Sequence, residues 1–253
     1  VDLSVIIPAY DESKRLPIML KETVDYLERR CKETTKRSFT YEIIIVDDGS
    51  KDNTIQVASE FSKEYSSADI RILALEKNRG KGGAVTQGML CARGRQCLMA
   101  DADGATQFSD IAKLEEQLDS IVNDDGYGIA VGSRSHLVST EAVVKRSFIR
   151  NFLMRGFHTL VYTLGIRGIE DTQCGFKLFT RKTAQLVFPN MHVERWIFDI
   201  ECLMIAQSQK VPIIEVQVTW HEIDGSKVNL ITDSVQMAKD LFLIRLNFIL
   251  GFW

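Results

Sequence analysis

The sequence predicts a single α/β domain built on a mostly parallel, Rossmann-like sheet. Short apolar runs alternate with segments in which apolar residues recur every three or four positions, as strands and helices in alternation would require. Several of the runs are almost wholly apolar and end in acidic residues, which is typical of strands buried on both faces. The 253 residues and the 45% hydrophobic content suit one domain with a sizeable core.

The expected elements follow one another in a regular order. Strands are expected where short apolar runs are closed by turn residues, at 3–8, 41–46, 70–75, 96–100 and 127–132. Helices are expected between and after them, at 16–31, 54–65, 82–92 and 110–122. Helical spacing returns in the tail, 229–253, which has an apolar end.

Two carboxylates, Asp101 and Asp103, follow the fourth strand on either side of Ala102. Open α/β sheets bind ligands at the carboxyl ends of their strands, and residues two apart on an extended chain share a face. Mg²⁺ and Mn²⁺ prefer oxygen ligands and often bridge carboxylates to substrate phosphates. The triplet therefore predicts a Mg²⁺ or Mn²⁺ site that holds a nucleoside diphosphate. The alternative is an Asx-turn that only caps the next helix.

The first two strands also end in residues suited to a nucleoside. Pro8, Tyr10 and Glu12 follow the first strand, where a ring can stack on a base and a carboxylate can accept ribose hydroxyls. Asp47 and Asp48 close the second strand. An ordinary strand-to-helix loop is the alternative at both places.

A glycine-rich segment, 78–83, leads into the third helix. Its backbone amides and the positive helix end can face a phosphate, and Arg79 or Lys81 would add charge. The segment is not a Walker motif, because GxxxxGK[ST] is absent. The alternative is a turn that merely starts the helix.

Charge and cysteine content narrow the choice of partners. The formal net charge of −3 gives no electrostatic case for a nucleic-acid partner. The segment 134–155 nevertheless carries five Lys or Arg residues against one acid, Glu141, and is a candidate for holding phosphate. The five scattered cysteines lack the spacing of a zinc site or a disulfide framework, so we interpret them as reduced and mostly buried. Reduced cysteines suit a protein that faces the cytosol.

Five strings resemble, in order and spacing, the family-two glycosyltransferases of the GT-A fold: VIIPAYDE, VDDGSKDNT, NRGKGGAV, DADGAT and GSR. Fuller strings, which reach to about residue 227, resemble the branch of that family that glucosylates dolichyl phosphate: NRGKGGAVTQGML, MADADGAT, DTQCGFKLF and RWIFDIE. The resemblance implies inverting transfer of glucose from UDP-glucose to dolichyl phosphate, giving dolichyl β-D-glucosyl phosphate for protein N-glycosylation. Residues 1–133 would form the nucleotide-sugar half, and residues 134–253 the acceptor and membrane-facing half.

On the donor side, the resemblance assigns an aspartate at Asp47 or Asp48 to the edge of uracil. It assigns Asp101 and Asp103 to the metal and the donor diphosphate, with Asp103 as the direct ligand. Residues 101–103 form the motif called DxD. Some relatives carry Leu-Gln directly after this motif, with the glutamine as an added metal ligand. Gly104 and Ala105 stand there in this chain, which puts a third protein ligand in doubt.

On the acceptor side, Arg134 and Arg146 match positions that bind the acceptor phosphate in related dolichyl-phosphate mannose synthases. Further candidates for that phosphate are Arg150 and Lys227. Asp199 stands where many relatives keep a catalytic base. A phosphate acceptor is already deprotonated near neutral pH and needs no strong base, so we interpret Asp199 as orienting the acceptor or its cationic partners. Helix N-capping is the alternative for Asp199.

Two segments are expected to meet a membrane surface. The helix 144–157 has a broad apolar face opposite its basic residues, and the tail 229–253 is apolar and helical. Either segment could instead pack in the core, and the tail could pack on a second subunit of a homo-oligomer. The resemblance implies a place at the endoplasmic reticulum membrane, a catalytic domain facing the cytosol and an N-terminal anchor outside this sequence.

Three other functions are alternatives to this prediction. A dolichyl-phosphate mannose synthase would use the same fold with GDP-mannose, and donor preference would distinguish it. A noncatalytic nucleotide-sugar-binding subunit would be expected to have lost the DxD or the acceptor arginines, and both are present. A sugar nucleotidyltransferase needs a glycine-rich signature directly after the first strand, which residues 8–12 lack.

Overall fold

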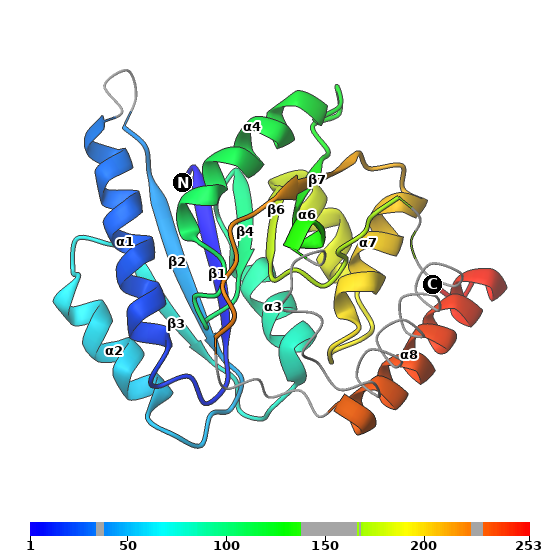
Figure 1. The fold of residues 1–253 in the computed structure, drawn as a ribbon, viewed down its shortest axis with the longest axis horizontal. Helices are drawn as coiled ribbons and strands as arrows, with labels where there is room; N and C mark the ends of the chain where they lie inside the picture. Colours follow the sequence, from blue (N-terminus) through cyan, green and yellow to red (C-terminus); the bar gives the residue numbers. More distant parts are fainter. Residues whose placement is uncertain (34–37, 138–165, 167, 224–229) are drawn as a thin grey trace.

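The computed structural model describes residues 1–33, 38–137, 166, 168–223 and 230–253. This part of the chain forms a seven-stranded sheet in the order β3-β2-β1-β4-β6-β5-β7 (Figure 1). Its strands are β1 Leu3–Ala9, β2 Tyr41–Asp47, β3 Ile70–Ala74, β4 Gln96–Ala100, β5 Ile129–Ser133, β6 Phe176–Thr180 and β7 Ile213–Gln217.

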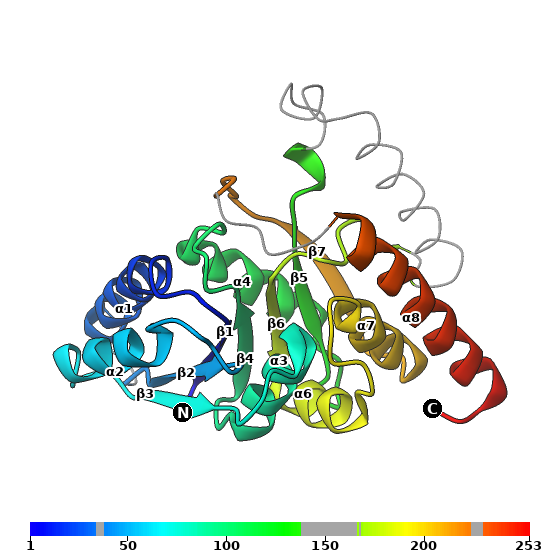
Figure 2. The ribbon, with the colours of Figure 1, turned by 90° about the horizontal axis from the view of Figure 1, so that it is seen from below.

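Helices cover both faces of the sheet (Figures 1 and 2). Helices α1, α2 and α4 share one hydrophobic cluster with the sheet, and α3, α6 and α7 share a second on the opposite face. Helix α8 packs against α7 at the outside of that second layer. Their bounds are α1 Leu16–Glu33, α2 Thr54–Glu64, α3 Gly80–Cys91, α4 Ile111–Ile121, α6 Arg181–Val187, α7 Phe198–Ser208 and α8 Leu230–Leu250.

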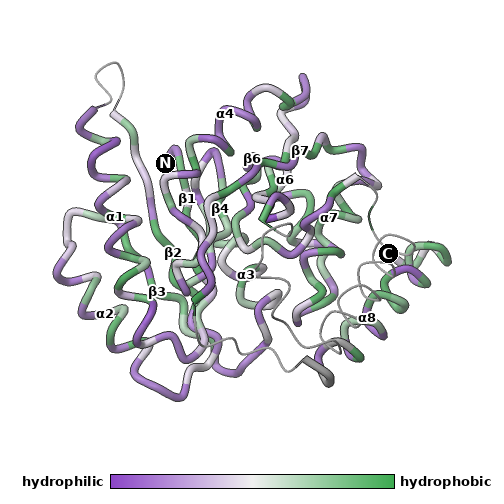
Figure 3. Tube along the Cα trace, in the orientation of Figure 1, coloured by the Kyte–Doolittle hydropathy of each residue, from purple (hydrophilic) through white to green (hydrophobic). Residues whose placement is uncertain are grey.

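This architecture confirms the predicted α/β class and the five strands and four helices expected within residues 1–133. Strands β1, β2, β4, β5 and β6 are almost wholly buried, because helices cover both faces of the sheet. Figure 3 shows the hydropathy of the residues along the chain. Helix α4 buries Ile111, Leu114 and Leu118, which recur at the predicted helical spacing. The tail also forms the predicted helix, α8.

The sequence analysis missed the antiparallel strand β6. The sheet is otherwise parallel, because β1 pairs with β2 and β4, β2 with β3, and β5 with β7 in parallel. Strand β6 lies between β4 and β5 and runs antiparallel to both. Lys177, the second residue of β6, therefore lies in the middle of the sheet, between Met99 of β4 and Val131 of β5.

The parallel strands bring their carboxyl ends to one edge, the lower edge in Figure 1. In the register of the sheet, Ala9 pairs with Asp47, and Asp47 pairs with Ala74. The loops after β1, β2, β4 and β5 therefore converge on this edge. Among the described residues, no helix is long and apolar enough to cross a membrane.

Candidate functional site

The loops after β1 and β2 are hydrogen-bonded into one unit. Asp11 has a positive φ of 51° and accepts the amide of Lys51 at 2.7 Å, while its own amide donates to Ser50 Oγ at 2.9 Å. The amide of Glu12 donates to Thr54 Oγ1 at 2.8 Å. This bonding fixes the loop that carries the predicted nucleoside residues against the start of α2.

Within this unit, Pro8 and Tyr10 are partly exposed, whereas Glu12 is buried. Both carboxylate oxygens of Glu12 accept from Arg15, at 2.7 Å from Nε and 2.5 Å from Nη2. The ribose contact expected of Glu12 stays a prediction. Its established partner is a guanidinium at the start of α1.

The neighbouring residues Asp47 and Asp48 have different surroundings. Asp48 accepts the amides of Arg79 at 2.7 Å and Gly80 at 2.8 Å, so its carboxylate ties β2 to the start of α3. Burial raises the pKa of Asp48 even though these two amides favour its charged form. Asp47 Oδ2 accepts the amide of Ser50 at 3.0 Å, while the buried Oδ1 has no hydrogen-bond partner in the described part of the chain. Of the two acids, Asp47 retains an acceptor for a ligand.

The glycine-rich start of α3 packs closely against the segment that precedes α7. A Cβ on Gly80 would lie 2.6 Å from the carbonyl oxygen of Glu194, and one on Gly82 would lie 2.5 Å from Phe198 Cβ. The amide of Gly83 donates to the same Glu194 carbonyl at 2.9 Å. The amides of Gly80 and Gly83 thus have protein acceptors, and the phosphate contact expected of this segment stays a prediction.

The two cations of this segment point to different partners. The Arg79 guanidinium pairs with the Glu194 carboxylate, away from the DxD. The Lys81 ammonium lies 2.7 Å from Asp101 Oδ1 and 2.9 Å from Oδ2, and the longer contact has hydrogen-bond geometry. Burial opposes the charged form of Lys81, but Asp101 and Asp199 more than offset it and raise its pKa. Lys81 is therefore the cation of this segment that faces the DxD.

The DxD is held tightly by its surroundings. A Cβ on Gly175 would lie 2.0 Å from Asp101 Oδ2, so only glycine fits there, and the Gly175 carbonyl accepts the Asp101 amide at 3.1 Å. Ala102 is buried, and Asp103 accepts the amide of Ala105 at 3.0 Å. Burial and the nearby charge of Asp101 raise the pKa of Asp103. The positive charges of Lys81 and Arg15 offset these two effects only in part.

A buried ion pair lies behind the DxD. The Lys177 ammonium on β6 pairs with Asp199 in the first turn of α7 and donates to the Cys174 carbonyl at 2.6 Å. Both side chains are at most 5% exposed. The N-cap of α7 is Ile197, so Asp199 is not the cap. Sequence reasoning assigned Lys177 no role, although a lysine inside the apolar string FKLF was a signal of a buried charge with a partner.

The acceptor side is represented by Arg134, which follows β5. Its backbone amide and its guanidinium both bind Asp171, with Nε at 2.7 Å and Nη2 at 2.9 Å. The guanidinium also lies 5.6 Å from the centre of the Trp220 ring. Burial alone would raise the pKa of Asp171, but Arg134 lowers it below its usual range. Arg134 and Asp171 are therefore both charged at neutral pH.

A bridge between Thr106 and Trp220 joins the segment after β7 to the DxD loop. The amide of His221 donates to the Ala105 carbonyl at 2.9 Å, which extends this contact. Trp220 thus contacts both Arg134 and the DxD loop and joins them on one side of the site. The other predicted acceptor residues lie outside the described residues: Arg146, Arg150 and Lys227.

The residues present suit a divalent cation only in part. Asp101 and Asp103 offer carboxylate oxygens at the expected edge, and the raised pKa of Asp103 indicates a place that a cation would stabilise. Among the described residues, no group of three or more His, Cys, Asp or Glu side chains is placed to hold a metal ion. Any further ligands would come from phosphate oxygens and water, as is usual for Mg²⁺.

The family model described as "Glycosyl transferase family 2" matches residues 4–187. The dolichyl-phosphate beta-glucosyltransferase of Dictyostelium discoideum is 54% identical over 99% of this chain and 76% of its own length. The enzymes of the same name from Homo sapiens and Saccharomyces cerevisiae are 51% and 48% identical, each over 99% of this chain and 77% and 76% of their own lengths.

Solved structures confirm the fold. Glucosyl-3-phosphoglycerate synthase of Mycobacterium tuberculosis, in complex with UDP, superposes with a TM-score of 0.62 at 14% identity, over 97% of this chain and 79% of that one. Mannosyl-3-phosphoglycerate synthase of Rubrobacter xylanophilus gives a TM-score of 0.61 at 14% identity, over 97% and 73% of the two chains. At this identity the likeness concerns the GT-A fold alone. By its sequence, the chain belongs to glycosyl transferase family 2 and, within it, to the dolichyl-phosphate beta-glucosyltransferases.

Proposed function

We propose that this protein transfers a glucosyl group from UDP-glucose to dolichyl phosphate, with inversion, to give dolichyl β-D-glucosyl phosphate for protein N-glycosylation. The observation that carries the proposal is the charge arrangement at the sheet edge: Asp101 of the DxD pairs with Lys81 and also interacts electrostatically with Arg134. Membership of the family, at about half identity over nearly the whole chain, supports the choice of substrates.

For the donor, the free oxygen of Asp47 supports recognition of the base. A buried carboxylate oxygen without a partner is costly, and an N–H at the edge of uracil would satisfy it. Tyr10 and Pro8 are partly exposed beside it and would provide apolar contact for the ring and ribose. Asp48 would act indirectly, by holding the start of α3 in place through Arg79 and Gly80.

For the leaving group, Asp101 and Asp103 would hold Mg²⁺ or Mn²⁺ against the donor diphosphate. A divalent cation at this position stabilises the negative charge that develops on the departing UDP. Lys81 would add a second positive charge on the same side of the DxD. Arg79 would contribute less directly, because its guanidinium is already paired with Glu194.

For the acceptor, the attacking phosphate oxygen is already ionised, so the protein has to orient it and screen its charge rather than remove a proton. Arg134 would do this, because its planar guanidinium suits phosphate oxygens and Asp171 holds it in place. Asp199 is buried and engaged by Lys177, which supports the positioning role over that of a base. Arg146, Arg150 and Lys227 remain predicted phosphate partners.

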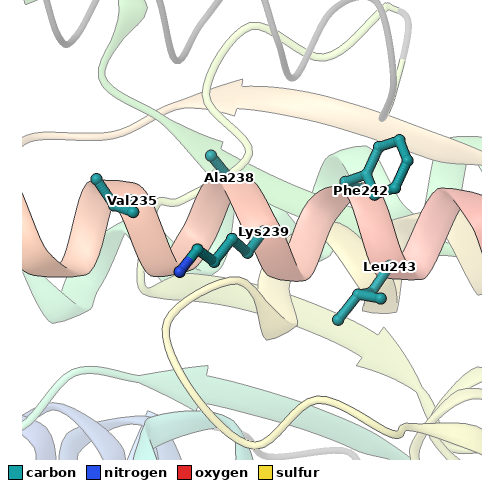
Figure 4. Close-up of a pocket in the computed structure, with 5 residues that line it drawn as sticks. All are labelled: Val235, Ala238, Lys239, Phe242 and Leu243. Carbon is teal, nitrogen blue, oxygen red and sulfur yellow. The ribbon is translucent and has the colours of Figure 1, made fainter.

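A lipid acceptor also requires a surface that meets a membrane, and α8 supports one. Its inner face packs Met237, Leu241 and Ile244 into the core. On its outer side, Val235, Ala238, Lys239, Phe242 and Leu243 line a shallow groove (Figure 4). The apolar exposure continues toward the end of the chain, where Ile249 is 69% and Phe252 is 73% exposed.

We further propose that this outer side of α8 rests on the endoplasmic reticulum membrane, with the catalytic domain facing the cytosol. Phe242→Asp combined with Ile249→Asp should weaken co-sedimentation with phosphatidylcholine–phosphatidylserine vesicles by about tenfold or more. Ile18→Asp combined with Ile55→Asp is a matched control, because these exposed residues lie on other helices. Equal losses for the two double variants would contradict the assignment to α8.

Two measurements test the proposed function. Thermal unfolding is followed with UDP-glucose or GDP-mannose, each with and without Mn²⁺, because selective binding raises the melting temperature. Transfer is then assayed with radiolabelled sugar nucleotide and a polyprenyl phosphate in detergent. We expect a metal-dependent shift and transfer with UDP-glucose alone. A response to GDP-mannose alone would indicate mannosyl transfer, and binding without transfer would indicate a noncatalytic subunit.

A further inference from the structure

The DxD carboxylate Asp101 is already bound by a cation of the protein itself. The Lys81 ammonium lies within 3 Å of both oxygens of Asp101, at 2.7 and 2.9 Å. On another side, Gly175 lies so close that a Cβ there would be 2.0 to 2.5 Å from the carboxylate atoms. The carboxylate is therefore confined by backbone on one side and by Lys81 on another.

Lys81 is held by more than this one contact. Asp199, at the start of α7, also attracts the ammonium, and Asp199 itself is fixed by the buried Lys177. The charges alternate from the DxD into the core in the order Asp101, Lys81, Asp199 and Lys177. The Lys81 side chain is only 19% exposed, so it is largely shielded from solvent.

An ammonium that contacts both oxygens of a carboxylate competes with a divalent cation for that carboxylate. Mg²⁺ requires carboxylate oxygens at about 2.0–2.1 Å, so it would take lone pairs that now face the Lys81 ammonium, and the two positive charges repel. A nucleoside diphosphate would supply a new anionic partner for Lys81 beside the DxD. Lysine has a flexible four-carbon stem, so its ammonium can change partners without movement of the helix.

We propose that Lys81 blocks Asp101 in the free protein and moves to the donor diphosphate when the donor and the divalent cation bind. This inference rests on the proposed function for the presence of the donor and the cation. It adds that the free protein binds the cation weakly and that the nucleotide is needed for tight binding. By linkage, the cation then tightens nucleotide binding by the same factor.

The test measures Mn²⁺ binding by electron paramagnetic resonance, without any turnover, on the purified protein with and without UDP. The wild type should bind Mn²⁺ about tenfold or more tightly with UDP than without it. Lys81→Met should bind Mn²⁺ about tenfold more tightly than the wild type in the absence of UDP, and the further gain on adding UDP should be smaller than in the wild type. Lys81→Arg should behave as the wild type, because it keeps the charge.

The control is Lys77→Met, which removes one positive charge from an exposed position four residues earlier. It should leave Mn²⁺ binding within about twofold of the wild type, because it changes only the long-range electrostatic potential of the protein, which salt screens. Each variant is checked by its melting temperature, and Lys81→Gln replaces Lys81→Met if the latter fails to fold.

Two results would overturn the inference. One is a wild type that binds Mn²⁺ equally well with and without UDP, and the other is a folded neutral variant at position 81 with unchanged Mn²⁺ affinity. Failure of the proposed function looks different. In that case the wild type binds no Mn²⁺ even in the presence of UDP, and Asp103→Ala is indistinguishable from it.

Discussion

Two acids of the predicted donor half, residues 1–133, and two of the predicted acceptor half, residues 134–253, are held in different ways. In the donor half, Asp48 is held by the amides of Arg79 and Gly80 and Asp52 by those of Ser13 and Thr54. In the acceptor half, side-chain cations hold Asp199 and Asp171, in the Lys177–Asp199 and Arg134–Asp171 pairs.

The difference has an energetic consequence. A carboxylate bound by backbone amides can lose its charge and still leave no opposite charge stranded. A buried ion pair behaves otherwise, because removing one partner leaves the other charge unpaired at low dielectric constant. We therefore expect the loss of one member of a buried ion pair to lower stability more than the loss of an acid held by backbone amides. Four predictions test this comparison.

The largest expected effect is on activity, at the DxD that follows β4. Asp103→Ala should lower transfer by at least about 100-fold and abolish metal-dependent donor binding, because charge on the leaving diphosphate is no longer stabilised. The variant should remain folded, because burial raises the pKa of Asp103 and the charged carboxylate is therefore unfavourable for stability. The control is Asp119→Ala at an exposed position of α4. Normal metal-dependent binding by Asp103→Ala would refute the assignment.

The next effect is on stability, at the buried pair of the acceptor half. Asp199→Asn or Lys177→Met alone should lower the free energy of unfolding by about 3–5 kcal/mol, and the double variant should lose less than the sum. The partly exposed Arg79–Glu194 pair is the comparison, and Arg79→Met should cost about 1 kcal/mol or less. Urea unfolding measures both. Equal losses at the two pairs would contradict the expected dependence on burial.

A smaller effect should separate two adjacent acids of the donor half. Asp47→Asn should weaken UDP binding by about tenfold with little loss of stability, because its free oxygen is the predicted acceptor for the base. Asp48→Ala should instead lower the free energy of unfolding by about 1–2 kcal/mol, because two amides at the start of α3 lose their acceptor. Calorimetry and urea unfolding distinguish them. The same response from both would contradict the assigned roles.

The smallest effect is a pH dependence at Asp52. Partial burial opposes ionisation, but hydrogen bonds from Ser13 and Thr54 outweigh it and lower the pKa of Asp52 to about 2. A depressed carboxyl pKa contributes stability above the unfolded value of about 3.9, and this contribution is lost as the pH falls toward 2. Asp52→Asn should therefore cost about 1 kcal/mol or less at pH 6, and its difference from the wild type should vanish near pH 2. A difference that persists at pH 2 would contradict this assignment.

Several features of the site could be predicted from the sequence because they depend on local pattern. The DxD, the acids after β2 and Arg134 each directly follow a strand, and parallel strands bring such positions to one edge. The role of the glycine-rich segment was harder to predict. The spacing of its glycines is the same whether they approach a phosphate or the segment around Glu194, and only the packing of α3 against that segment decides.

The α/β class, the order of elements in the first half and the position of the DxD were determined by the sequence alone. Apolar periodicity specifies strands and helices, and these place the residues that follow them. The tertiary structure alone decided that β6 runs antiparallel between β4 and β5, which carries Lys177 into the core and brings Gly175 against Asp101. It also decided that Lys81 pairs with Asp101 and Lys177 with Asp199. The two residues of each ion pair lie twenty or more positions apart in the sequence. Strand order and close packing bring them together, and the local sequence pattern predicts neither.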